Sequence, residues 1–155
     1  MKLSSLFNIQ TVYAHCDIPC GIYDPHNAQL AAHTVIRMTR MIEEVKGSDK
    51  KAIHDISRMT HVKEEHGHLV EDELGTLEND YFKDEHYKAY PNLKELLEKG
   101  VKLSVKVRQG IDMEAAKELL ETVLQISEIF YKTKDVTPIR VKSVYPTEGE
   151  MVFYK

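Results

Sequence analysis

Two cysteines and a histidine stand close together near the N-terminus of this 155-residue chain. Cys16 and Cys20 are its only cysteines, and His15 directly precedes the first of them. A disulfide across the tight, proline-containing loop, or a pair of inert buried thiols, would be a purely structural interpretation. Thiolate, imidazole and backbone nitrogen donors together are, however, ligands that suit late first-row metals. Zinc held by both cysteines and two histidines stays open, although the usual spacing of zinc-binding motifs is absent.

A second metal geometry becomes available if the mature chain begins at His15. The free α-amine of His15, the amide nitrogen of Cys16 and the two thiolates would then form a square-planar set of two nitrogens and two sulfurs. Such a set suits Ni(II) or Cu(II), with the His15 imidazole as an axial ligand. In the uncleaved chain the His15 nitrogen is an amide, so this geometry requires cleavage after Ala14. Residues 1–14 have a broken apolar pattern that is not typical of a secretory signal, and we interpret them as a removable propeptide.

The segment from His15 to Pro25 resembles a known metal-binding hook. It reads His-Cys-Asp-Ile-Pro-Cys-Gly-Ile-Tyr-Asp-Pro, and it is similar at every motif position to the nickel hook of the nickel superoxide dismutases. The resemblance continues over roughly residues 15–135, and it includes the Asp80-Tyr-Phe-Lys83 motif. A motif of this length, placed before a helical region, is specific to the family.

The resemblance implies a nickel-dependent enzyme that disproportionates superoxide to oxygen and hydrogen peroxide by Ni(II)/Ni(III) cycling. One nickel ion per subunit would be held by His15 (amine and imidazole), Cys16 (amide nitrogen and thiolate) and Cys20 (thiolate). Tyr23 and Asp17 are the expected catalytic residues: Tyr23 would position the small anion near the open axial face, and Asp17 would shape the hook. The family is made with a propeptide that a maturation peptidase removes before the histidine, and its subunits form homohexamers.

Two positions depart from the family pattern. Some members carry a glutamate on the first helix that orients the hook histidine, with an arginine partner on the second helix. The corresponding residues here are Ala31 and, by gapped alignment, His66. Other residues must therefore orient the His15 imidazole. Two alternatives to the enzyme stay open: a nickel-binding or delivery protein that uses the same hook without turnover, and a structural bundle whose two thiols form a disulfide.

The elements that would position the hook are four amphipathic helices. Apolar residues recur with helical spacing over residues 28–45, 49–81, 91–110 and 112–130. Short turns join these stretches, so we expect an all-α, antiparallel up-and-down four-helix bundle with an N-terminal metal-binding hook. Asp24 and Asp112 each stand where a helix N-cap is expected.

This pattern divides the chain into four parts. We expect a removable propeptide at 1–14, the nickel hook at 15–24, the bundle at 25–135 and an extended C-terminal tail at 136–155. The tail carries several apolar residues, which indicates that it packs on the bundle or on a neighbouring subunit.

Composition narrows the classes of partner. The formal net charge is −4, which argues against a broad nucleic-acid interface. No apolar run approaches the roughly 18–20 residues that a membrane span needs, so we expect no membrane partner. Because the leader is not signal-like and the two thiols must stay reduced, we expect the protein to be cytoplasmic.

Overall fold

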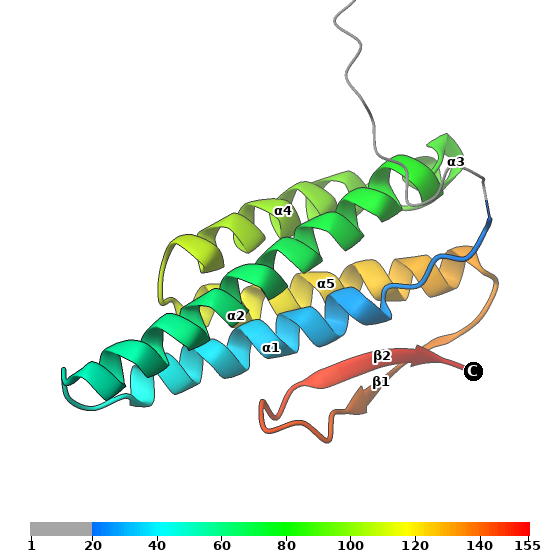
Figure 1. The fold of residues 1–155 in the computed structure, drawn as a ribbon. Helices are drawn as coiled ribbons and strands as arrows, with labels where there is room; N and C mark the ends of the chain where they lie inside the picture. Colours follow the sequence, from blue (N-terminus) through cyan, green and yellow to red (C-terminus); the bar gives the residue numbers. More distant parts are fainter. Residues whose placement is uncertain (1–19) are drawn as a thin grey trace, which may run out of the picture.

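The computed structural model of this protein describes residues 20–155, and it consists of four long helices and a small hairpin packed against them (Figure 1). In chain order the elements are α1 (His26–Glu44), α2 (Lys50–Thr76), the π-helical turn η2 (Leu77–Tyr81), α3 (Asp84–Ala89), α4 (Leu93–Gln109), α5 (Met113–Thr133), β1 (Pro138–Lys142) and β2 (Glu150–Tyr154). The long helices α1, α2, α4 and α5 run alternately up and down (Figure 1). The predicted antiparallel four-helix bundle is confirmed.

Aspartate side chains cap two of the long helices, and the cap at Asp112 is the predicted one. The side chains of Asp49 and Asp112 accept hydrogen bonds from the backbone N–H groups of Ala52 (2.7 Å) and Ala115 (2.9 Å). Such caps satisfy N–H groups that have no partner within the helix, and each contributes about 1 kcal/mol. These bonds fix the first turns of α2 and α5.

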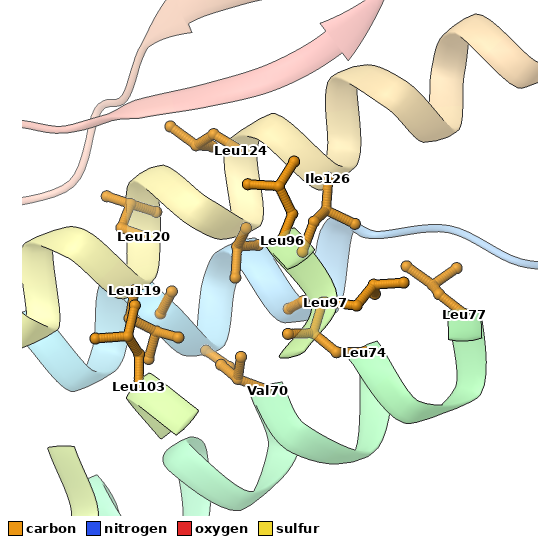
Figure 2. Packing of buried hydrophobic residues seen from close by; sticks show 14 of the residues in the cluster. Val70, Leu74, Leu77, Leu96, Leu97, Leu103, Leu119, Leu120, Leu124 and Ile126 are labelled. Carbon is orange, nitrogen blue, oxygen red and sulfur yellow. The ribbon is translucent and has the colours of Figure 1, made fainter. Parts of the chain in front are cut away.

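The core lies between the four helices, and most of its members are leucine, isoleucine, valine and alanine side chains. Figure 2 shows leucines of α2 and α4 pointing toward α5. Helices α2 and α4 approach closely at Gly100, where a Cβ atom would lie 2.5 Å from the Cδ1 atom of Leu74. A larger residue at this position would therefore force α2 and α4 apart or displace Leu74.

The second helix differs from its prediction at its C-terminal end. The apolar pattern predicts one helix as far as Tyr81, but regular α-helix ends at Thr76 and a π-helical turn follows. The backbone N–H of Phe82 closes this turn on the carbonyl of Leu77 at 2.8 Å. A π-turn changes the direction in which side chains leave the helix, and here it carries Tyr81.

The C-terminal segment is more ordered than an extended tail. Its two strands pair antiparallel, with Ile139 opposite Phe153 and Val141 opposite Met151. The hairpin packs on the protein's own helices. Met151 of β2 is buried, whereas the residue before it is exposed, so one face of the strand is covered. No helix within residues 20–155 is both long and apolar enough to cross a membrane.

Candidate metal centre

The described residues include part of the predicted site. Cys20 and Tyr23 belong to this part, whereas His15, Cys16 and Asp17 lie outside the described residues. Within residues 20–155, no three His, Cys, Asp or Glu side chains form a group that could hold a metal ion. The predicted ligand set therefore combines Cys20 with two residues outside that range.

Cys20 lies on an exposed stretch of chain that precedes α1. The backbone N–H of Ile22 donates to the Cys20 Sγ atom at 3.5 Å, across Gly21, whose φ of +72° is readily adopted only by glycine. An N–H donor stabilises the thiolate form of a cysteine, which is the form that binds metals. An accessible thiol with such a donor fits a soft ligand to nickel.

The root of the hook is fixed to two helices through Asp24. Its carboxylate accepts the backbone N–H of His26 at 2.8 Å, at the start of α1, and the hydroxyl of Tyr131 on α5 at 3.4 Å. Helix α1 begins at His26, one residue later than the predicted start at Pro25. Burial, followed by the nearby Asp24 carboxylate, raises the pKa of Tyr131 well above its usual range. The phenol therefore keeps its proton and remains a hydrogen-bond donor at neutral pH.

Tyr23 packs against an aromatic cluster that η2 places at this end of the bundle. Its ring centroid lies 5.5 Å from that of Tyr81, which in turn contacts Phe130 at 4.7 Å and stacks on His86 at 5.5 Å. A hydrogen bond of 2.7 Å joins the hydroxyl of Tyr81 to Thr133. Tyr81 is therefore held from several sides, and it forms a rigid wall for Tyr23.

Two lysines bring positive charge to the same region. The Lys134 Nζ atom lies 4.5 Å from the ring centroid of Tyr81, and Lys83 donates to the carbonyl of Asp80 at 2.9 Å. Lys83 belongs to a motif that the family resemblance includes, but its bond to Asp80 was not predicted. Nothing in the sequence around Lys134 signals its position, because the packing of α5 against η2 creates it.

A small cavity beside Tyr23 separates the hook segment from α2. Its volume is about 190 Å³, and it is bordered by Ile22 and by residues of α1 and the end of α2. Asn27 donates to the Glu73 carboxylate at 3.1 Å along its border. This amide–carboxylate pair was not predicted, since the two residues are far apart in sequence.

The two positions that depart from the family pattern do not line this small cavity. Ala31 is buried in the core of α1. His66 is half-buried on α2, its Nδ1 atom is 2.9 Å from the carbonyl oxygen of Val62, and it borders a different cavity. The polar pair that does line the cavity beside Tyr23 is Asn27 of α1 with Glu73 of α2.

The described part of the chain is an antiparallel four-helix bundle whose N-terminal segment exposes a cysteine that could serve as a metal ligand. Comparison with known proteins identifies the class. The model of the family described as nickel-containing superoxide dismutase matches residues 10–134. The chain is 36% identical over 133 residues to the nickel superoxide dismutase of Streptomyces seoulensis, and 35% identical to that of Streptomyces coelicolor. Each alignment covers 85% of this chain and 98% of the relative.

Solved structures of nickel superoxide dismutases resemble this chain as well. A native nickel superoxide dismutase superposes with a TM-score of 0.70 at 32% identity, covering 77% of this chain and 99% of its own. A second, whose nickel ligation corresponds to the oxidised state, gives 0.71 at 33% identity and covers 78% and 99%. This chain belongs to the nickel-containing superoxide dismutase family. The family match ends at residue 134, before the C-terminal hairpin begins.

Proposed function

We propose that this protein is a nickel-dependent superoxide dismutase that converts superoxide to oxygen and hydrogen peroxide. The observation that carries this proposal is the exposed Cys20 thiol, which lies on a hook segment whose root is fixed to α1 and α5. Membership of the nickel-containing superoxide dismutase family supports the same reaction. A delivery protein would need the same ligands, but no observation favours it.

The proposed ligands are His15, Cys16 and Cys20, which would hold one nickel ion per subunit. His15 can offer its α-amine only after cleavage behind Ala14, so residues 1–14 would be a propeptide that a maturation peptidase removes. When bound, nickel supplies one-electron redox chemistry, because anionic thiolate and amide donors make its +3 state accessible. Thiolates that work beside peroxide are liable to oxidation, so bound nickel would also protect Cys16 and Cys20.

The surrounding residues would guide the substrate and its protons. Tyr23, held against Tyr81, would exclude molecules larger than superoxide and order the water that supplies protons to the product. Asp17 would shape the hook. Lys83 and Lys134 would raise the local positive potential, which a protein of net charge −4 needs in order to attract an anion.

We further propose a homohexamer in the cytoplasm, without nucleic-acid or membrane partners. The hexamer is the assembly that the resemblance of the hook to the nickel superoxide dismutases implies. In this proposal, residues 15–24 form the hook and residues 25–135 the bundle.

The test uses protein processed to begin at His15 and loaded with nickel. We expect one nickel per chain and superoxide turnover, and we expect Cys16→Ser and Cys20→Ser to abolish both. Ser48→Ala, at an exposed position between α1 and α2, is the control and should retain both. Stoichiometric nickel without turnover would instead identify a delivery protein. A disulfide between the two cysteines in native, metal-free protein would support a structural bundle.

A further inference from the structure

The C-terminal hairpin lies beyond the family match, yet its last strand ends beside the root of the hook. Along β2, the ring centroid of Phe153 lies 6.0 Å from that of His26, in the first turn of α1. The ring of Tyr154 lies 5.0 Å from that of Tyr131 on α5. Figure 1 shows β2 running alongside the helices toward the end from which the hook emerges.

Contacts along its whole length fix the hairpin in place. The buried side chain of Gln29 accepts the backbone N–H of Val152 at 2.7 Å and donates to its carbonyl at 3.1 Å. Near the turn, buried His33 hydrogen-bonds the Thr147 hydroxyl at 2.6 Å. On the other side, Arg140 forms ion pairs with glutamates of α5. The end of β2 is therefore held in one position relative to α1 and α5.

From that end, a chain of direct contacts leads to the hook. Tyr154 packs on the ring of Tyr131, and the hydroxyl of Tyr131 donates to the carboxylate of Asp24. Asp24 is the last residue of the hook and stands four positions after Cys20. The side chain of Tyr154 remains 57% exposed, so its contact with the buried Tyr131 ring covers little apolar surface.

We infer that Tyr131, Phe153 and Tyr154 form an aromatic brace that fixes the root of the hook, which makes the C-terminal hairpin a positioning element of the nickel site. This inference rests on the proposed function. A metal site binds most tightly when its ligands are already oriented before the metal arrives, and residues behind the ligands provide that orientation. Because the match to the family model ends at residue 134, the hairpin supplies this support from outside the matched region.

The experiment compares Tyr154→Ala and Tyr131→Phe with Asp112→Ala, all in protein that begins at His15. Tyr154→Ala removes the ring that restricts Tyr131, and Tyr131→Phe removes only the hydroxyl that reaches Asp24. Asp112→Ala removes the N-cap of α5, at the far end of that helix from Tyr131, and leaves the hairpin and the brace untouched. The readouts are the nickel dissociation constant, the electron paramagnetic resonance spectrum of the nickel-loaded protein, and hydrogen exchange of the His26 amide in the metal-free protein.

We expect both brace variants to weaken nickel binding by about ten-fold, to broaden the spectrum and to speed exchange at His26. Asp112→Ala should lower the melting temperature while leaving all three readouts near wild type. Wild-type readouts in both brace variants would overturn the inference, as would equal changes in Asp112→Ala. If the wild-type protein binds no nickel, the proposed function fails, whereas exchange at His26 still tests the brace.

Discussion

Gln29 offers the sharpest test of how the hairpin is attached to the bundle. This fully buried side chain on α1 makes two hydrogen bonds to the backbone of Val152, and so it pairs with β2 as a neighbouring strand would. Gln29→Met keeps the length and approximate volume of the side chain but removes both bonds. The N–H and carbonyl of Val152 then stay buried without partners.

The structure sets the size of the effect. Each buried polar group left without a partner costs about 1–3 kcal/mol, so the two groups of Val152 together cost about 3 kcal/mol. For a chain of this length, each 1 kcal/mol shifts the melting temperature by about 2–4 °C, so we expect a fall of about 6–12 °C. Gln125→Met is the matched control. That glutamine hydrogen-bonds only Glu121 on the surface of α5, and its loss should change stability by less than about 0.5 kcal/mol.

The assay is thermal and urea unfolding of the metal-free protein, followed by circular dichroism, because bound nickel would itself raise the melting temperature. Hydrogen exchange at the Val152 amide reports the same bond locally and should become faster in Gln29→Met. Equal midpoints for the Gln29 and Gln125 variants, together with unchanged exchange at Val152, would refute the proposed attachment.

Three further predictions concern the bundle, pH and the substrate. Burial lowers the pKa of His33 below its ordinary value, so the folded protein binds fewer protons there than the unfolded chain. The His33 contribution to stability is therefore present above about pH 6.5 and is lost as the pH falls through the folded pKa. Between pH 7 and pH 5, the urea midpoint of His33→Gln should therefore fall less steeply than that of the wild-type protein. Gly100→Ala should lower the unfolding free energy by about 1 kcal/mol, because overlap with Leu74 outweighs the gain in helix propensity. Gly75→Ala, whose new Cβ atom would meet no close atom, should raise the unfolding free energy. The packing argument would be contradicted if both variants lost stability or if neither did. Lys134→Gln should lower kcat/KM for superoxide about three-fold at low salt and less at high salt, whereas an unchanged salt dependence in stopped-flow assays would exclude steering by this lysine.

Local signals explain what could be predicted from the sequence. Helical spacing of apolar residues identified the four long helices, and the aspartate at position 112 marked the start of one of them. The hook depends on residues that are adjacent in sequence, so its motif was recognisable without a fold. The ligand set of His15, Cys16 and Cys20 stays a prediction, since two of these residues lie outside the described part of the chain.

Long-range contacts explain what was missed. The hairpin depends on Gln29 and His33, which lie more than 100 residues away from the strands that they hold, and no spacing rule connects them. The π-turn keeps the apolar spacing of a helix, so the sequence pattern does not distinguish it from one. Lys134 reaches Tyr81 only because α5 packs against η2. Positions of this kind follow from packing between elements and have no local sequence signal.

The central claim is that a hook beginning at His15 makes this bundle a nickel superoxide dismutase. The most direct measurement is the rate of superoxide decay in stopped flow, using nickel-loaded protein that begins at His15 and the same protein with residues 1–14 retained. We predict catalytic decay with the processed form and only the spontaneous rate with the uncleaved form, whose His15 nitrogen is an amide. A spontaneous rate with fully nickel-loaded, processed protein would contradict the claim.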